Sequence, residues 1–227
     1  MIKIENFEVL GWEHAIRGMR NPMNSWEKSD SGWEPQFDTV QGPVAGEFII
    51  GPNDYALMKN LRNAGTDHRK FMRMVTVYLD ITAPLYFWKE FDTYKVGTVA
   101  NSCSTMHKIA AKEFTLEDFS CEHLFHNIND TEMWFDIDFL KVLDNTIFYL
   151  NKARELYLKT HDKKYWWQMI QLLPSSYNQK RTVMLNYEVL ANIYPMRKNH
   201  KLDEWRDFCK WIETLPYSEL ITGEGYE

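Results

Sequence analysis

The sequence predicts a protein of mixed α and β secondary structure, for three reasons. Segments near the N-terminus carry alternating or β-branched apolar residues, which is the pattern of strands. Residues 132–159 carry apolar side chains at helical spacing, which predicts a long helix. Residues 173–206 predict a turn, a helix, a basic junction and a second helix. With 227 residues, the chain is expected to form a single domain spanning residues 1–227.

The N-terminal half supplies the predicted strands and short helices. Strands are expected at residues 2–10, 47–50 and 71–81, and helices at residues 12–20, at 54–62 with Asp54 as the cap, and at 84–94 after a Thr82 cap. Residues 21–43 are rich in turn-forming residues and predict a long loop, in which Trp26 and Trp33 argue against disorder. The aromatic stripe of the 84–94 helix is interpreted as core, with a cofactor-facing surface as the alternative.

One long helix is expected in the second half, at residues 132–159. Its buried stripe is predicted to contain Phe135, Phe139, Leu143, Ile147, Leu150 and Leu158. Trp134, Phe148 and Tyr157 widen this stripe, as a helix buried on two sides requires. Such a helix is suited to a subunit interface.

Composition excludes several classes of function. Aromatic residues make up 15% of the chain and nine are Trp, which favours a thick core, an oligomer interface or stacking on a flat ligand. A net charge of −6 argues against a broad nucleic-acid footprint. No apolar run approaches the about 20 residues of a membrane helix, and no signal sequence is evident. Three scattered cysteines predict reduced thiols, and a cytoplasmic protein is expected.

The stretch of residues 173–206 holds the strongest candidate site residues. Asn186 and Arg197 are eleven residues apart, which places them near one face of a helix, three turns apart. Pro195 is expected to kink or end that helix just before Arg197. Arg197 would then stand at a helix exit beside Lys198 and His200, where a guanidinium can grip a planar anionic ligand.

This stretch resembles the C-terminal signature of the flavin-dependent thymidylate synthases. The residues at matching intervals are Leu173, Pro174, Tyr177, Asn186, Leu190, Arg197, Glu204 and Arg206. The resemblance implies that Asn186 and Asn192 contact the flavin and that Arg197 contacts the pyrimidine as the catalytic residue. Two positions depart from the signature, since Glu188 replaces an Arg and Asp203 replaces a Gln.

A second motif of that family, R-H-R-x-x-S-x-N-E-x-S-x-R-Y, corresponds to residues 94–107 in one of two registers. Alignment on Asn101 and Ser104 leaves Tyr94, Lys95 and Val96 in place of R-H-R. A shift by one residue puts Lys95 at the second Arg, Thr98 at the first Ser and Cys103 at the second Ser. Both registers stay open, and an ordinary polar loop is the alternative to either. The resemblance implies Lys95, Asn101 and Ser104 as cofactor-binding residues, and Lys95 and Thr98 as substrate-binding residues.

The resemblance also implies an architecture and a reaction. The expected fold is α+β, with a small antiparallel sheet flanked by long helices, assembled as a homotetramer with FAD and dUMP between subunits. The implied reaction is the reductive methylation of dUMP to dTMP with methylenetetrahydrofolate, FAD and NADPH. The alternatives are a non-catalytic nucleotide or flavin binder, an enzyme acting on a modified pyrimidine nucleotide, and a purely structural oligomer.

Other constellations are weaker. Arg17 and Arg20 are interpreted as a solvated face, with phosphate binding as the alternative. Cys121, His123 and His126 lack a fourth ligand and a standard spacing, so no metal site is expected. Cys103 is expected to be a small buried residue rather than a nucleophile. Neither a Rossmann nor a P-loop fingerprint is present in the sequence.

Overall fold

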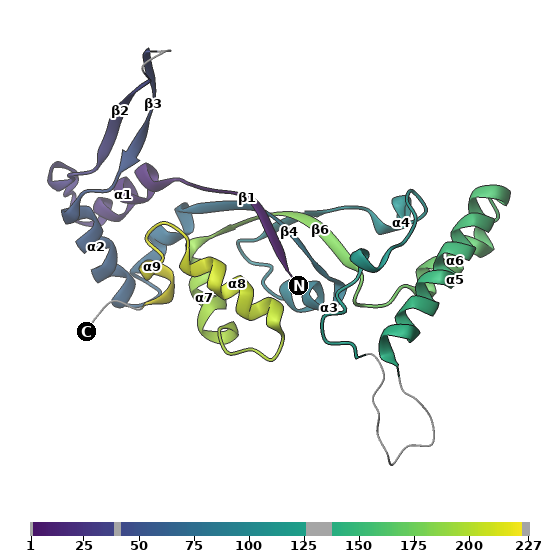
Figure 1. Ribbon diagram of the computed structural model, residues 1–227. Helices are drawn as coiled ribbons and strands as arrows, with labels where there is room; N and C mark the ends of the chain where they lie inside the picture. Colours follow the sequence, from purple (N-terminus) through teal and green to yellow (C-terminus); the bar gives the residue numbers. More distant parts are fainter. Residues whose placement is uncertain (1, 39–41, 126–137, 224–227) are drawn as a thin grey trace. The chain divides into compact units, whose positions relative to one another are not determined.

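The computed structural model describes residues 2–38, 42–125 and 138–223. Its fold is α+β with a small antiparallel sheet and several helices, which confirms the expected fold class (Figure 1). Four strands form one sheet in the order β1-β4-β6-β5, and β2 and β3 form a separate hairpin. The chain divides into two compact units, each described here by itself. Unit 1 comprises Met1–Ile4, Asp80–Thr93 and Asn101–Thr182, and unit 2 comprises Glu5–Leu79, Tyr94–Ala100 and Val183–Glu227.

The four-stranded sheet consists of β1 (Lys3–Leu10), β4 (Thr76–Pro84), β6 (Asn178–Asn186) and β5 (Val99–Ser102). On β4 the alternating side chains of Val77, Leu79, Ile81 and Ala83 are buried. This period of two confirms the predicted apolar face of that strand. The expected start at residue 71 is wrong, because Arg69–Met74 is a 3-10 helix, η3.

A β-hairpin occupies much of the stretch predicted to be a loop. Two 3-10 turns, η1 (Asn21–Met23) and η2 (Trp26–Lys28), are followed by β2 (Gly32–Asp38) and β3 (Gly42–Ile49). The strands are antiparallel with Trp33 opposite Phe48, and a register shift lies between Glu34 and Gln36. The long-loop prediction is therefore wrong, because cross-strand pairing ordered a segment whose composition favours turns.

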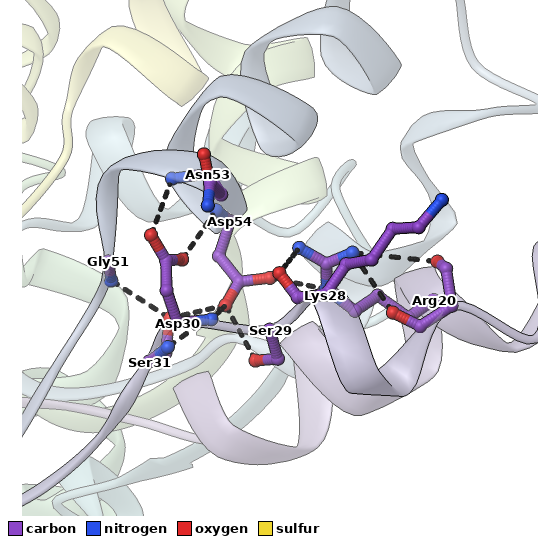
Figure 2. A network of polar contacts seen from close by, with 9 residues as sticks. Arg20, Lys28, Ser29, Asp30, Ser31, Gly51, Asn53 and Asp54 are labelled. Carbon is purple, nitrogen blue, oxygen red and sulfur yellow. Dashed lines mark hydrogen bonds and ion pairs between the residues drawn. The ribbon is translucent and has the colours of Figure 1, made fainter.

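Helices α1 (Trp12–Arg20) and α2 (Pro52–Asn63) are joined by a buried polar network in unit 2, shown in Figure 2. Arg20 Nε donates to Asp54 Oδ1 at 2.6 Å, and both side chains are buried. The other carboxylate oxygen, Oδ2, accepts hydrogen bonds from the hydroxyls of Ser29 and Ser31, each at 2.7 Å. The solvated-face interpretation is thus wrong for Arg20, whereas Arg17 is exposed, as that interpretation expected.

Asp54 does not cap α2, contrary to the prediction. The backbone amides of Asn53 and Asp54 donate to the carboxylate of Asp30, which thereby acts as the cap from a neighbouring segment (Figure 2). Burial alone would raise the pKa of Asp54, but hydrogen bonds from Ser29, Ser31 and Arg20 outweigh burial and lower it.

The C-terminal part of unit 2 contains α7 (Tyr187–Arg197), α8 (Asp203–Glu213) and α9 (Glu219–Thr222). The helix predicted from Thr182 is wrong in its first turn, because β6 continues to Asn186. Pro195 lies inside α7 and does not end it before Arg197. A proline near the C-terminal end removes only one hydrogen bond of the helix, which the remaining contacts tolerate. Trp205, Phe208 and Ile212 bury one face of α8.

Unit 1 contains α3 (Leu85–Phe91), α4 (Thr105–Lys108), η4 (Leu116–Asp118), α5 (Phe139–Thr160) and α6 (Lys163–Leu172). Phe87, Trp88 and Phe91 are buried, which confirms that the aromatic stripe is core. The N-cap of α3 is Pro84, so the Thr82 cap is wrong.

Helices α5 and α6 lie side by side (Figure 1). They share an apolar cluster with Ile109, Phe114, Phe119, Leu143, Leu150, Ala153 and Met169. The predicted stripe of α5 is only partly correct, since Phe139, Phe148 and Leu158 are exposed. Residues 132–137, including Trp134 and Phe135, lie outside the described residues. Among the helices described, none has the length and apolar character to span a membrane.

Candidate functional site

Arg197 ends α7 and packs against two aromatic rings of unit 2. Its Nε donates a hydrogen bond of 2.8 Å to the hydroxyl of Tyr94. Its Cζ lies 4.5 Å from the ring centre of Trp205 and 5.6 Å from that of Tyr94. A guanidinium on an aromatic face is stabilised by the ring quadrupole. The side chain is therefore held in a defined orientation at the helix exit.

The turn between α7 and α8 supports this arrangement. The backbone amide of Leu202 donates to Nδ1 of His200 at 3.2 Å, and Arg206 Nη1 donates to the His200 carbonyl at 2.8 Å. Trp205 is fully buried on the first turn of α8 and lies edge-on to Tyr94, with ring centres 5.8 Å apart. The turn thus fixes the aromatic surface against which Arg197 rests.

Asn186 caps the N-terminus of the same helix. Its Oδ1 accepts a hydrogen bond from the Val189 amide at 3.0 Å, which leaves the Nδ2 end of the carboxamide as a donor. Gly97, with φ of 77°, passes close to that end: a Cβ at Gly97 would lie 3.0 Å from Asn186 Nδ2 and 3.0 Å from Val189 Cγ2. Only glycine adopts this positive φ and also fits the narrow space beside Asn186 and Val189 without strain.

Thr98 follows Gly97, and its hydroxyl is buried. Within the described residues, Thr98 Oγ1 has no hydrogen-bond partner. A buried hydroxyl of this kind is costly unless a hydrogen-bond partner is supplied to it. Lys95, by contrast, is exposed. The residues predicted to bind nucleotide therefore include one buried hydroxyl and one solvated cation.

Glu188, which occupies the place of an Arg in the signature, is buried in an ion-pair network. Its Oε2 accepts from Arg73 Nε at 2.5 Å, and its Oε1 lies 3.7 Å from Arg69 Nε. Arg69 Nη2 also donates to Asn192 Oδ1 at 2.8 Å. Both arginines belong to η3. Their positive charges compensate the negative charge of Glu188 within unit 2. The side-chain oxygen of Asn192 therefore accepts a hydrogen bond within this network, and its Nδ2 group remains the donor end of the side chain.

Unit 1 contains a cavity of about 530 Å³ beside the second motif. Lys108, Lys112 and Lys180 line it, together with the predicted Ser104 and residues that include Cys103, Thr105, Tyr177 and Gln179. Lys112 pairs with Asp118, and Lys180 with Asp80 at 3.1 Å. The carboxylates of Glu117 and Asp118 also line the cavity, so the charge of its walls is mixed.

The walls of this cavity are held by specific hydrogen bonds. Gln179 Nε2 donates to the Cys103 carbonyl at 3.0 Å and to Thr105 Oγ1 at 3.1 Å. Ser104 Oγ accepts from the His107 amide at 3.2 Å and so caps α4. Burial, and then the neighbouring Asp118 carboxylate, raise the pKa of Tyr177, so its phenol stays protonated as a donor.

The structure distributes the predicted residues over both units. Asn186, Asn192, Arg197, Lys95 and Thr98 belong to unit 2, whereas Asn101 and Ser104 belong to unit 1.

Asn101 and Cys103 are both exposed. The prediction that Cys103 is buried is therefore wrong, because it follows the short, exposed strand β5. No cluster of metal-ligating residues occurs in the part of the chain that is described, and His126 lies outside that part.

Several residues that pack on Arg197 or line the unit 1 cavity were not found from the sequence. Trp205, Lys108, Lys112, Lys180 and Gln179 were not singled out. Their only signal is proximity to motif positions, since Lys108 follows residues 94–107 and Lys180 lies shortly after Tyr177. Their convergence depends on tertiary folding.

Over nearly its full length the chain has the α+β fold of flavin-dependent thymidylate synthases and of a related nucleotide methylase, which confirms the resemblance at the level of the fold. Thymidylate synthase X (ThyX) from Helicobacter pylori, solved with FAD and dUMP, is 17% identical with a TM-score of 0.66, covering 99% of this chain and 98% of that one.

The UMP/dUMP methylase PolB from Streptomyces cacaoi, bound with 5-Br UMP, is 11% identical with a TM-score of 0.61, covering 99% of this chain and 96% of that one. No family model matches the sequence, and no curated protein does.

Proposed function

We propose that the protein is a flavin-dependent enzyme that methylates a pyrimidine nucleotide, converting dUMP to dTMP with methylenetetrahydrofolate as carbon donor and NADPH as reductant. The observation that carries this proposal is the near-complete coverage in the fold match to ThyX, together with Asn186 and Arg197 at the two ends of one helix. The solved ThyX holds FAD and dUMP, and PolB holds 5-Br UMP, which supports a pyrimidine nucleotide as substrate.

The residues present fit an anionic flavin nucleotide. Asn186 offers amide N–H donors to the flavin, beside the close backbone approach at Gly97. Unit 1, taken by itself, offers lysines and hydroxyls at its own cavity, where a phosphate could bind. A bound flavin would supply the hydride chemistry of the reaction.

The roles of the protein's own residues are positioning and electrostatics. We assign Arg197 to the pyrimidine, where its fork can donate to a carbonyl oxygen and stabilise negative charge that develops on the ring. Asn186 and Asn192 donate to the flavin, Lys95 and Thr98 bind the substrate phosphate, and Asn101 and Ser104 belong to the cofactor side. A homotetramer that completes the site from neighbouring subunits is part of the same proposal.

The PolB likeness favours a second candidate substrate, UMP or a modified pyrimidine nucleotide. The loss of the R-H-R triplet favours a third possibility, a non-catalytic binder, because only Lys95 remains as a cation there.

Purification with FAD, followed by absorbance spectroscopy, distinguishes the enzyme from the non-catalytic binder. Flavin that is bleached by NADPH and reoxidised in a dUMP-dependent manner supports the enzyme. Bound flavin without nucleotide-dependent reoxidation supports the binder, and a protein that binds neither contradicts both. The same experiment with UMP in place of dUMP identifies the preferred sugar.

A further inference from the structure

The contact between Tyr94 and Arg197 joins the two stretches singled out in the sequence. We propose that Tyr94 is a positioning residue that fixes the plane of the Arg197 guanidinium for the pyrimidine nucleotide. The inference rests on the proposed function, in which Arg197 contacts the pyrimidine. It adds a residue whose identity, Tyr, is unlike any of the three residues of the R-H-R motif.

The geometry restricts the guanidinium from two sides. The Tyr94 hydroxyl accepts from Nε at 2.8 Å, and Trp205 lies under the guanidinium at 4.5 Å from Cζ. The rings of Tyr94 and Trp205 meet at 69°, so they form a corner around the guanidinium. Trp205 is fully buried and Tyr94 half-buried, which makes one wall of this corner part of the core.

The choice of Nε as the donor has a mechanical consequence. Nε is the guanidinium nitrogen nearest the aliphatic stem, and a hydrogen bond to it fixes rotation of the planar group about the end of that stem. Arg has many rotamers, and its affinity for a planar ligand improves when the fork is oriented before the ligand arrives. Tyr94 therefore acts through Arg197 rather than on the nucleotide.

The position of Tyr94 in the chain strengthens this inference. It directly precedes the segment with Lys95, Gly97 and Thr98, which approaches the start of α7 at Asn186. A single short segment thus reaches both ends of α7: Gly97 lies close to Asn186, and Tyr94 contacts Arg197. Movement of this segment would change the orientation of both predicted ligand contacts.

The test is the dUMP affinity of the FAD-loaded protein, measured by isothermal titration for wild type, Tyr94→Phe, Arg197→Lys and the double variant. Phenylalanine keeps the ring and removes only the hydroxyl. We expect Tyr94→Phe to weaken dUMP binding on the order of tenfold, as loss of a hydrogen bond to a charged group does. Tyr149→Phe, which changes an exposed tyrosine of α5, is the matched control and should bind as wild type does.

The double variant separates positioning from a general structural role. Lysine has no Nε–H fork for Tyr94 to orient, so Tyr94→Phe should cause no further loss in the Arg197→Lys background. An equal loss in both backgrounds, or no loss from Tyr94→Phe alone, overturns the inference while the proposed function stands. A wild-type protein that binds FAD but no dUMP or UMP contradicts the proposed function, and this inference with it.

Discussion

Glu188 and Arg73 form a hydrogen-bonded ion pair of 2.5 Å between the first turn of α7 and η3. The Glu188 side chain is 8% exposed, and Arg69 approaches its other oxygen. Glu188 replaces an arginine of the resembled signature. The charge reversal is thus paired with arginines of η3, and we expect the residue at 188 to serve stability.

Glu188→Gln should therefore destabilise the protein more than a surface substitution does, because it removes the buried charge that compensates two arginines. Chemical denaturation followed by tryptophan fluorescence measures this. Glu155→Gln is the matched control, since Glu155 forms an exposed pair with Lys152 that should contribute little. A Glu188→Gln protein as stable as the control variant would contradict the structural role.

Breaking the Arg20–Asp54 pair should lower the free energy of unfolding further than breaking the Glu188–Arg73 pair does. Asp54→Asn leaves the buried Arg20 without its counter-ion, and we expect a loss of about 3 kcal/mol in the free energy of unfolding. Asp144→Asn, at an exposed position of α5, is the control and should change little. Equal stabilities for the two variants would contradict the importance of the network in Figure 2.

The same pair predicts a pH dependence. Since the pKa of Asp54 in the folded protein lies below its ordinary 3.8, the carboxylate stabilises the fold fully above that value. This stabilisation is lost as the pH falls through the lower, folded-state pKa. The stability difference between wild type and Asp54→Asn should therefore shrink below pH 3.8. A difference that stays constant down to the acid unfolding of the protein would exclude this linkage.

Gly97→Ala should impair flavin retention. The substitution places a methyl group 3.0 Å from Asn186 Nδ2 at a backbone φ of 77°, which L-residues rarely adopt. Gly65→Ala is the control, because Gly65 has a φ of 108° but open space around its Cβ position. Both variants should lose about 1 kcal/mol from backbone strain. Only Gly97→Ala should release more FAD on gel filtration, and equal retention in both would count against the site.

Cys103 and Cys209 should react with a thiol reagent in a fixed order. Cys103 is exposed and should react first. Burial, and then the neighbouring Glu213 carboxylate, raise the pKa of Cys209 to about 12, so its thiol stays protonated and should react only after unfolding. Mass spectrometry of peptides after timed alkylation measures this order. Early labelling of Cys209 would show that α8 packs differently.

Periodicity predicted much of the fold, and its failures have physical causes. The alternating face of β4 and the helix at residues 12–20 were readable from local patterns. Residues 182–186 were assigned to a helix because Val183 and Leu185 were grouped with the helical residues that follow, whereas they alternate as buried residues of β6. The β2–β3 hairpin was missed because its pairing is not visible in a composition rich in turn formers.

The site was predictable in sequence spacing but not in contacts. The sequence placed Asn186 inside a helix that begins at Thr182, whereas Asn186 is the N-cap of α7 and Arg197 is its last residue. The partner of Arg197, Tyr94, is 103 residues away in sequence, and the partner of Glu188, Arg73, is 115 residues away. One sequence carries no signal for such pairs, since their proximity is created only by folding.

The central claim is tested most directly by incubating the FAD-loaded protein with NADPH, methylenetetrahydrofolate and dUMP, and by measuring the nucleotide product by mass spectrometry. We expect dTMP from the wild type, and none from Arg197→Ala at a level of bound FAD equal to that of the wild type. Absence of dTMP from a wild-type protein that retains FAD and binds dUMP would contradict the proposed reaction.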